Sequence, residues 1–599
     1  MGKINVEDIN VDHIWRTLGP WGKYQWKQLS SYLFICVSWV IHQLSIVFIG
    51  YRPAFQCQAF PNDSHLINTT NVRIKYEECQ RVVYENTTAG IKEEITQCDH
   101  GWNYDIPKEQ SFVTEWDFVC ENAELAELTQ SLLIVGMMLG TFICPTLSDK
   151  FGRKPVMVFS HITLFGIVLG TSFSNNYYVF VVLRILTGTV TQGALSGTTL
   201  ALETFPTEVR HYTECLALGM WTTAICVMSP IAYALRNVSW RYLQITYALM
   251  SSWSIFQWWM LDESLRWVIA NGQIDRAKQI IKNACKWNKK NYEEVLAKTG
   301  FTDDFVGNEL AGKELGQLIS KSSSEHAQNS DPSASEHTQN GVKDSSSEGR
   351  AGDSDVHVKH YSIIDIVRHK SIFKVSLIMW YTWIVDSLVY YGLYMISSDL
   401  YGDRYINFFL SALIEYPASI FEYYALGRIG RKWTCIICHL VAAVSLIVAT
   451  ALTYTAGENS AMLAAGTAFI LVGKMGITGA FSSAYVVTPE LYPTTMRNSG
   501  LGVASFMGKV GGMIAPFSRN VSQSVKWLPA CIYAALCFIT VFLFAFVPET
   551  NGVELPQTIE ELTEWYRVNK FELKIGKNRH AGARRNSDII IAKSKDDEL

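Results

Sequence analysis

The feature that most restricts the fold of this chain is a series of apolar runs, each about 20 residues long. A helix of that length crosses about 30 Å of hydrocarbon, and since lipid offers the backbone no hydrogen bonds, such runs must be helical. Only 18% of the residues are charged, and most of them lie between the runs. The sequence therefore predicts an all-α membrane protein with twelve transmembrane helices. The predicted spans cover residues 29–50, 127–147, 156–174, 177–201, 212–235, 240–261, 371–398, 404–427, 433–455, 461–487, 497–518 and 526–547.

Basic residues mark one side of the predicted membrane. They precede the first span and fill the turns after the second and eighth spans, whereas turns of opposite parity are poor in Lys and Arg. The positive-inside rule then places both termini in the cytoplasm. A polar start and a long first apolar run indicate that no signal peptide is cleaved. The predicted regions are a cytoplasmic N-terminus (1–28), a six-helix half (29–261), a cytoplasmic loop (262–370), a second half (371–547) and a cytoplasmic tail (548–599).

The loop at residues 51–126, between the first two spans, is predicted to be extracellular. It contains three Asn-x-Ser/Thr acceptor patterns for glycans, which favours the same orientation. It also holds four cysteines, an even number suited to an oxidising compartment. Four cysteines allow three pairings, and the sequence does not choose among them. The predicted glycan sites are Asn62, Asn68 and Asn86, and the cysteines are Cys57, Cys79, Cys98 and Cys120.

The predicted cytoplasmic loop changes character along its length. Its first part, "DESLRWVIANGQIDRAKQIIKNACKW", has the period of short amphipathic helices. Residues 321–355 are Ser-rich and nearly free of large apolar side chains. Because such a segment cannot bury enough apolar surface to fold, we expect it to be disordered.

Three motifs recur in the same order in the two halves. "SDKFGRK" after the second span matches "LGRIGRK" after the eighth, and "ETFPTEVR" after the fourth matches "ELYPTTMR" after the tenth. "DESLRW" after the sixth span matches "PETNG" after the twelfth. Three ordered pairs at corresponding helix ends predict two homologous six-helix halves, the parallel-repeat architecture of the major facilitator superfamily.

The repeated motifs place acids and bases together at the cytoplasmic helix ends. We hypothesise that this cluster stabilises the outward-open state and separates when the cavity opens inward, with Arg431 and Glu203 as one testable pair. The alternative is that these cations only anchor the topology beside anionic lipid. The residues of the predicted cluster are Asp149, Arg153, Lys154, Glu203, Arg210, Glu263, Arg431, Lys432, Glu490 and Arg497.

A longer set of motifs carries a family resemblance. A loop ending "TEWDFVCE", followed by "LSDKFGRKP", "DESLRW", "YYGL" and "TPELYPTTMRNSGLG", resembles the organic cation, organic anion and carnitine transporters of the same superfamily. "GDRYINFFLSALIEYPAS" is most similar to the carnitine and zwitterion branch. The resemblance spans nearly the whole chain apart from the Ser-rich segment and the tail. It implies a secondary transporter of small organic ions.

Ionisable residues inside the spans are the candidates for substrate contact, because they cost free energy in lipid and normally face protein or water. Lys509 lies mid-span in "SFMGKVGGMIAPF", at a position that the resemblance implies to be a charge selector, acidic in cation carriers and basic in anion and carnitine carriers. A structural ion pair is the alternative for Lys509. Glu415 precedes Pro417, which kinks a helix. It can attract a cation, pair with Lys509 or have a gating role.

Span seven adds one acid and three aromatic residues. Asp386 lies four residues before Tyr390, so both share a helix face. Tyr390, Tyr391 and Tyr394 offer rings that hold ammonium groups through their quadrupole, although tyrosines also form interfacial belts. Arg184 and Lys474 occupy similar places in the two halves, and we expect them to form intramembrane charge pairs, with substrate contact as the second interpretation.

An acid, a base and aromatic faces together favour a zwitterion or small organic cations moved across the plasma membrane by alternating access. An organic anion exchanger is the alternative, and a non-transporting receptor or scaffold on a transporter fold is the second alternative. The sequence has no Walker loop, zinc spacing or nucleophile elbow, so no enzyme, metal or nucleic-acid partner is expected. Uphill transport would then use Na⁺, H⁺ or exchange. The terminal "KDDEL" can offer its carboxylate to a PDZ-type module.

Overall fold

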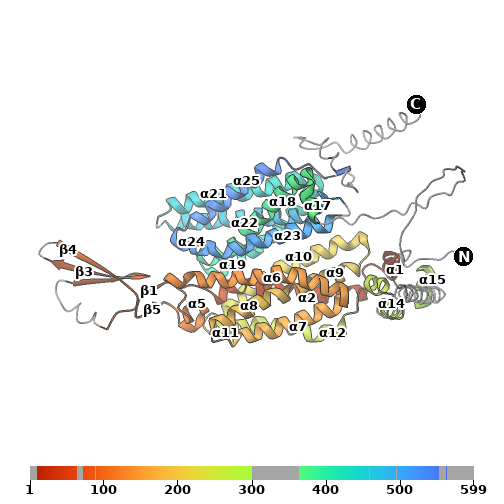
Figure 1. Cartoon of the computed structure of the whole chain (residues 1–599), viewed down its shortest axis with the longest axis horizontal. Coiled ribbons are helices and arrows are strands. Elements are labelled where there is room, and N and C mark those ends of the chain that lie inside the picture. The colour runs from red at the N-terminus through yellow and green to blue at the C-terminus, as the bar shows by residue number, and fades with distance from the viewer. Residues whose placement is uncertain are drawn as a thin grey trace, which may run out of the picture. The chain divides into compact units, whose positions relative to one another are not determined.

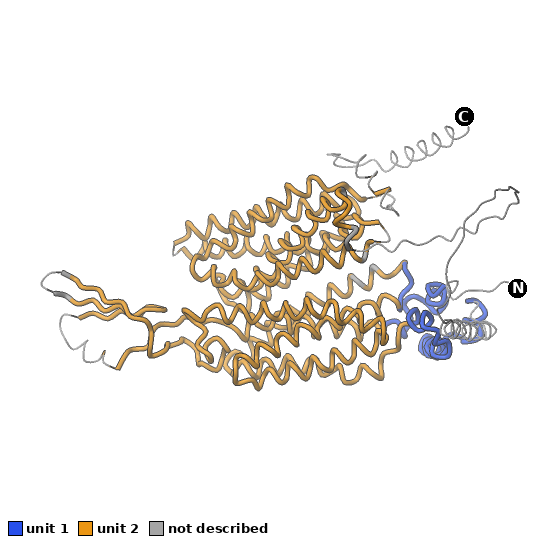
Figure 2. Tube along the Cα trace, in the orientation of Figure 1, with its two compact units in different colours: residues 1–26, 204–207, 265–361 blue, residues 27–203, 208–264, 362–599 orange. Residues whose placement is uncertain are grey.

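The computed structural model of the chain describes residues 10–61, 63, 72–87, 90–299, 363–457, 459–493, 496–551, 561–562 and 565. The predicted glycan sites Asn62 and Asn68, the Ser-rich segment 321–355 and the C-terminal carboxylate lie outside these residues. The chain divides into two compact units. Residues 1–26, 204–207 and 265–361 form the smaller unit, and residues 27–203, 208–264 and 362–599 form the larger one (Figure 2).

All twelve predicted spans coincide with helices in the described residues. The first six are α2 (Lys23–Leu44) with α3 (Ile46–Ile49), α6 (Ala123–Phe151), α7 (Arg153–Ser172), α8 (Tyr177–Thr191) with α9 (Gly193–Glu203), α10 (Arg210–Ala234), and α11 (Trp240–Met250) with α12 (Ser254–Met260). The second six are α18 (Lys370–Met395), α19 (Arg404–Leu413) with α20 (Glu415–Arg428), α21 (Arg431–Thr455), α22 (Ser460–Glu490), α23 (Arg497–Ile514) and α25 (Leu528–Phe544).

Eight helical segments of the described residues are long and apolar enough on their own to cross a membrane. The other four predicted spans are shorter, more polar or broken: α11 with α12, α19 with α20, α23, and α25. The break between α19 and α20 has a local cause. Pro417 has no N–H to donate to the carbonyl of Leu413, and α19 ends at that residue.

The two groups of helices form two halves of the larger unit (Figure 1). In the first half α6 packs on α8, and α7 packs on α9 and α11. In the second half α21 packs on α22 and α25, and α18 packs on α23. The halves meet where α6 contacts α23 and where α10 contacts α19. The structure thus has the predicted division into two six-helix halves.

The loop between α3 and α6 departs from the all-helical prediction. Strands β1 (Phe55–Cys57) and β5 (Trp102–Tyr104) pair antiparallel, and β3 (Gln80–Thr87) pairs antiparallel with both β2 (Val72–Tyr76) and β4 (Gly90–Gln97). Residues 72–76 and 80–87 are rich in β-branched and aromatic side chains, the composition that suits strands. Asn86, the third predicted glycan site, lies in β3.

The loop is cross-linked by its four cysteines. Cys57 is bonded to Cys98 and Cys79 to Cys120, with Cα–Cα distances of 5.3 and 5.6 Å. An acid, Asp63, is buried beside Arg81 and Tyr76, which both donate hydrogen bonds to it. Burial acts to raise the pKa of Asp63, but these hydrogen bonds and the Arg81 charge outweigh it, so the pKa lies below its ordinary value.

The smaller unit has its own apolar core. It contains α1 (Val11–Leu18), α13 (Leu265–Ala270), α14 (Ile274–Asn288) and α15 (Tyr292–Thr299). Trp15 of α1 and Ile281 of α14 belong to this core and are almost fully buried. Asn288 donates to the carbonyl of Leu18 at 3.1 Å, and its Oδ1 accepts from the Tyr24 N–H at 2.9 Å. Helix α1, before the first span, therefore folds with the amphipathic helices predicted after the sixth.

Candidate functional site

A charged cluster lies at each of the two Gly-Arg turns. At the α6–α7 turn, Arg153 Nε lies 3.7 Å from Glu203 Oε2 and Arg153 Nη2 lies 3.1 Å from Asp149 Oδ1. At the α20–α21 turn, Arg431 Nε lies 3.3 Å from Glu490 Oε2. We call these the first and second hairpin clusters. The repeated motifs therefore produce the same arginine–glutamate contact in both halves.

A carboxylate also caps the helix that follows each turn. Glu263 Oε1 accepts from the backbone N–H groups of Arg153 and Lys154, at 3.0 and 3.1 Å. Glu549 accepts from the first two N–H groups of α21 in the same way, at 2.8 and 3.2 Å. These N–H groups have no partner within their own helix, and the helix dipole favours an anion there.

Glycine is required at both turns by the backbone and by the carboxylate. Gly152 and Gly430 have φ values of 105° and 109°, a region that residues with a Cβ rarely adopt. A Cβ on Gly152 would overlap the Glu263 carboxylate, and one on Gly430 would overlap that of Glu549. The two turns are therefore built alike down to the backbone.

Three further predicted residues of the clusters bind backbone carbonyls, and Lys154 Nζ lies 4.9 Å from the centre of the Trp258 ring. Arg210 Nε donates to Leu202 O and Arg497 Nε to Pro489 O, both at 3.0 Å. Lys432 Nζ donates to Ala545 O at 2.7 Å. Each ion pair and hydrogen bond named here joins helices of one half. Arg431 thus contacts Glu490 where we had suggested Glu203, whose own arginine contact is Arg153.

A second set of polar contacts lies deep in the helices and is centred on Glu415, at the start of α20. Its Oε1 lies 3.4 Å from Lys474 Nζ and accepts from Tyr394 Oη at 2.8 Å. Its Oε2 accepts from Thr222 Oγ1 of α10, in the other half, at 3.2 Å. Both charged side chains are buried, with 2% and 1% of their surface exposed. The predicted pairing of Glu415 with Lys509 is replaced by a pair with Lys474.

The tyrosines of α18 surround the Lys474 ammonium group. Lys474 Nζ lies 3.2 Å from the centre of the Tyr390 ring and 3.8 Å from that of Tyr394. Tyr390 Oη accepts from the Trp221 indole at 3.1 Å, which adds a contact to α10. Two of the three tyrosines predicted for substrate thus hold an internal cation. Tyr391 packs edge-on against Tyr390.

Lys509 differs from the other intramembrane charges. It is half-buried, and within the described residues it has no hydrogen bond or ion pair. Gly512, three residues further on the same face of α23, lies against Tyr391 of α18 and Ile134 of α6. Lys509 therefore lies on a face of α23 that borders both α18 of its own half and α6 of the first half.

Asp386 does not join the Glu415 network. Its Oδ1 lies 2.8 Å from His439 Nε2 of α21, and neither side chain has exposed surface. Arg184, which we expected in a charge pair, has neutral partners: it donates to Gln130 Oε1 and to the carbonyl of His42. Like Lys474, it is 1% exposed.

A further set of contacts joins the halves near the disulfide-linked loop. Arg519, after α23, donates to Gly50 O at 2.8 Å and lies 3.6 Å from Asp399. Arg52 reaches the other way, donating to Asn520 Oδ1 at 3.2 Å. Both arginines are largely buried, so these contacts close the molecule at this end.

Sequence reasoning missed His439, Thr222 and the two closing arginines. A histidine inside an apolar run is an intramembrane ionisable group, so the rule that selected Asp386 would also have found His439. Thr222 carries no such signal because threonine is common in membrane helices. Arg52 and Arg519 lie at predicted span ends, where basic residues ordinarily mark topology.

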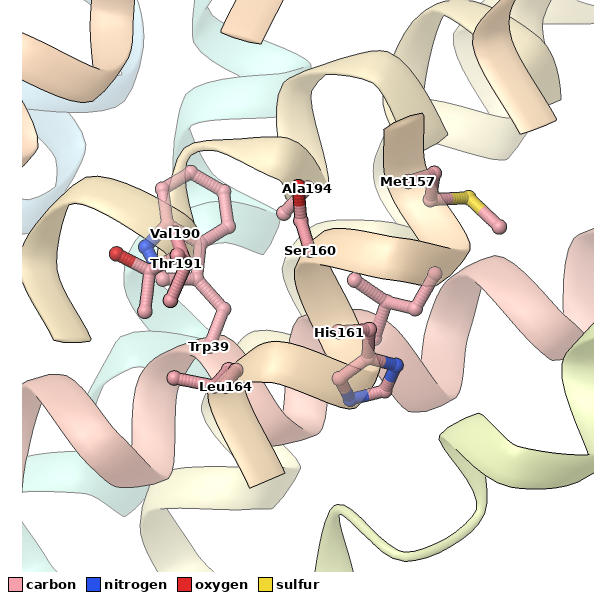
Figure 3. A pocket seen from close by; sticks show the side chains of 9 residues that line it. Trp39, Met157, Ser160, His161, Leu164, Val190, Thr191 and Ala194 are labelled. Atoms are coloured by element: carbon pink, nitrogen blue, oxygen red, sulfur yellow. The ribbon is translucent and has the colours of Figure 1, made fainter. Parts of the chain in front are cut away.

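A small cavity of about 10 Å³ lies inside the first half, between α2, α7, α8 and α9 (Figure 3). That volume accommodates about one water molecule. Trp39 and Thr191 line it, and the neighbouring His161 bonds Gln257 at 2.9 Å. None of the predicted substrate residues lines this cavity, so it is not a candidate for an organic substrate.

Comparison with known proteins shows what the chain resembles. Residues 122–516 match the sequence profile described as Major Facilitator Superfamily. Solute carrier family 22 member 6-A of Xenopus laevis is 28% identical over 92% of this chain and 94% of its own length. Organic cation/carnitine transporter 2 of Rattus norvegicus is 28% identical over 94% of this chain and 96% of its own length.

A solved structure has the same fold. The partially occluded inward open conformation of the xylose transporter XylE from E. coli aligns with a TM-score of 0.54 at 13% identity, covering 89% of this chain and 100% of that one. At this level of identity the likeness supports the fold, two bundles of six helices, and says nothing of substrate.

Proposed function

Since the chain belongs to the Major Facilitator Superfamily and is a secondary transporter, we propose that it carries small organic ions that bear a carboxylate, zwitterions first and simple organic anions second. The observation that carries this proposal is that Lys509 has no hydrogen bond or ion pair within the described residues. Glu415 has Lys474, Asp386 has His439, and Arg184 bonds neutral groups. A cation without a polar partner attracts an anionic group and repels a simple cation.

The relatives are consistent with this substrate class. Organic cation/carnitine transporter 2 of Rattus norvegicus is named for organic cations and carnitine, and organic anion transporter 3 of Sus scrofa, 28% identical over 88% of each chain, is named for organic anions. The Lys474 ammonium group lies over the rings of Tyr390 and Tyr394, which leaves the ring of Tyr391 for another cation. The side chain of Tyr485 in α22 is half-exposed. These rings can receive the ammonium end of a zwitterion.

Alternating access follows from where the halves touch. The Arg52 and Arg519 contacts tie the halves together at the end with the disulfide-linked loop. The two arginine–glutamate pairs of the hairpin clusters, Arg153–Glu203 and Arg431–Glu490, each lie within one half. To pass substrate to the other side, the arginine contacts must break. The Glu415–Thr222 contact lies between the halves and must break or slide in the same step.

The test is uptake of labelled carnitine, labelled benzoate and labelled tetraethylammonium by cells that express the chain, compared with Lys509→Asp. We expect wild type to take up carnitine or benzoate. Uptake by Lys509→Asp should be at least about tenfold lower, the equivalent of about 1.4 kcal/mol. Tetraethylammonium uptake should rise in the variant. The matched control is Lys526→Asp, which changes an exposed lysine after α24 (Ser518–Ser524) and should behave as wild type.

Two results would contradict the proposal. One is wild-type uptake of tetraethylammonium alone, and the other is carnitine or benzoate uptake that Lys509→Asp leaves unchanged. If none of the three probes enters cells that display the protein at their surface, the receptor or scaffold alternative is favoured.

We also propose that the protein lies in the plasma membrane with both termini in the cytoplasm. The two disulfides support an oxidising location for the loop between α3 and α6, and the basic turns support the opposite side for the hairpin clusters. Antibody tags at residue 1 and in the loop, read in intact and permeabilised cells, test this. A PDZ-type partner for the terminal "KDDEL" rests on sequence alone, and binding by a peptide with and without Leu599 tests it.

A further inference from the structure

The second half contains a buried acid–imidazole pair that the transport site does not use. Asp386 of α18 and His439 of α21 meet at 2.8 Å with no exposed surface. The His439 ring stacks on Phe544 of α25, with ring centres 6.2 Å apart. The pair is thus enclosed by three helices, in a place where an unbalanced charge is costly.

The second ring nitrogen fixes the proton count of the pair. His439 Nδ1 lies 2.9 Å from the carbonyl oxygen of Cys435, and since a carbonyl only accepts, Nδ1 must carry a hydrogen. Nε2 and Asp386 Oδ1 then need one proton between them. It sits either on the carboxyl, beside a neutral imidazole, or on the imidazole, beside a carboxylate. Both forms are electrically neutral.

Changing the proton count by one would leave a net charge in the interior. Removing the shared proton places a carboxylate against a nitrogen lone pair. Adding a proton leaves an imidazolium beside a carboxylic acid, whose hydrogen would need an acceptor near Oδ2, and Asp386 Oδ2 is buried without a hydrogen-bond partner among the described residues. The sealed pair therefore holds one proton firmly, and the proton count can change only when water enters.

The packing of α18 provides a way to open the pair. This helix packs mainly on α22, α23 and α25. The hydrogen bond from Asp386 to His439 links it to α21 as well. One turn further along α18, Tyr390 accepts from Trp221 of the first half. Movement between the halves therefore pulls on the helix that carries Asp386.

Among the described residues, the other titratable groups around the pair are three thiols and two acids. Cys435 and Cys438 of α21 and Cys537 of α25 interact electrostatically with Asp386, but thiols ordinarily lose their protons about two pH units above imidazoles. Two acids, Glu422 of α20 and Glu549 after α25, act on these cysteines and add negative charge. They favour retention of the proton.

We propose that Asp386 and His439 form a proton-binding site, and that it exchanges its proton with water during the transport cycle, so that a pH gradient drives or retards transport. The proton comes from hydronium or buffer on one side and leaves to water on the other, and no other reactant is needed. The inference rests on the proposed transport function. It assigns H⁺ as the coupling ion and gives it a location.

The first test measures uptake of labelled carnitine and benzoate with and without an inward pH gradient, between about pH 6 and about pH 8. We expect the gradient to change wild-type uptake by at least about threefold, the equivalent of about 0.65 kcal/mol. His439→Gln, which keeps a hydrogen-bond donor, should transport without responding to the gradient. His161→Gln is the matched control, since His161 is also buried but bonds the neutral Gln257. It should respond as wild type does.

A response retained by His439→Gln, or a transporting wild type with no response, would overturn the proposal. If the single variant is not produced, the neutral pair Asp386→Asn with His439→Gln replaces it. A readout without substrate separates failure of this inference from failure of the proposed function. Infrared spectra of the purified full chain should show an Asp386 band, from the carboxylic acid or the carboxylate, that changes between about pH 6 and about pH 8 and that Asp386→Asn removes. An unchanged band overturns the site, whether or not any probe is transported.

Discussion

Arg184 in the first half lies among neutral partners, Gln130 and the carbonyl of His42, whereas Lys474 in the second half faces the Glu415 carboxylate at 3.4 Å. The two cations stand on the fourth and tenth membrane helices and are equally buried. Around the Gly-Arg turns, by contrast, the halves share their main contacts: each has an arginine on a glutamate and a second glutamate that caps the following helix.

This comparison of the two halves distinguishes contacts that the fold requires from contacts that serve a function of one half. Contacts present in both halves serve requirements that both share, namely a tight turn and a capped helix. Contacts present only in the second half, Glu415–Lys474 and Asp386–His439, meet a requirement that the first half lacks. We assign substrate and proton handling to the second half because it contains the unpaired Lys509 together with the deep pairs Glu415–Lys474 and Asp386–His439. Arg184, the intramembrane cation predicted in the first half, bonds uncharged groups.

The largest expected loss of stability comes from substituting one buried cation in each half, which tests whether Lys474 and Arg184 differ as the structure indicates. Lys474→Gln leaves Glu415 as a buried carboxylate without its cation, which costs about 3–5 kcal/mol. Arg184→Gln removes a buried charge that has no acid beside it and leaves an amide that can still bond Gln130, so it should cost about 1–2 kcal/mol. Thermal unfolding of the purified variants measures both.

The double variant Lys474→Gln with Glu415→Gln controls for the loss of the lysine stem. It removes both charges and should recover most of the stability that Lys474→Gln loses, while uptake stays low because the contact with Thr222 is weakened. Equal losses for Lys474→Gln and Arg184→Gln would show that the two buried cations are equivalent and would remove the basis for the comparison.

A smaller loss of stability is expected from substitutions at the two Gly-Arg turns, where the halves have the same contacts. Gly152→Ala and Gly430→Ala each force a residue with a Cβ into positive φ, at about 1–2 kcal/mol, and push aside the carboxylate that caps the next helix. We expect the two variants to lower the unfolding temperature by similar amounts. Gly219→Ala, in a helix where a Cβ meets open space, is the control and should not destabilise. If only one of the two variants lowers the unfolding temperature, only that turn contributes to stability.

Much of the fold was predictable because lipid leaves few choices. Each span needs about 20 apolar residues, and this requirement gave all twelve helices, including α11 with α12 and α19 with α20, which are broken. The loop between α3 and α6 folds in water, where periodicity is the weaker signal of short strands, and its two sheets were not predicted. Its cysteine pairing was left open because three pairings satisfy the same sequence.

The site was predictable in its residue types but not in its partners. The cost of charge in lipid pointed to Glu415, Asp386, Lys474 and Lys509, but it does not say which base each acid meets. Glu415 and Lys474 are 59 residues apart and meet only because α20 packs on α22. Arg431 and Glu490 are likewise brought together by packing within one half. Repeats in the sequence identified these residues, and only the structure assigned the contacts.

The smallest expected loss of stability comes from removing one hydrogen bond in each hairpin cluster, and it tests whether the two clusters are equivalent. Ser264 donates its hydroxyl to Glu203, and Thr550 donates to Glu490 in the second half. Ser264→Ala and Thr550→Val each remove one hydrogen bond to a carboxylate that keeps its arginine, so each should cost about 1 kcal/mol, and the two costs should be similar. Thr246→Val, whose exposed hydroxyl bonds only its own helix, is the control. Because the arginines hold the glutamates in either case, uptake should change less than stability. A variant in one half that abolishes uptake while its counterpart does not would show that the two clusters, though built alike, have different roles in the transport cycle.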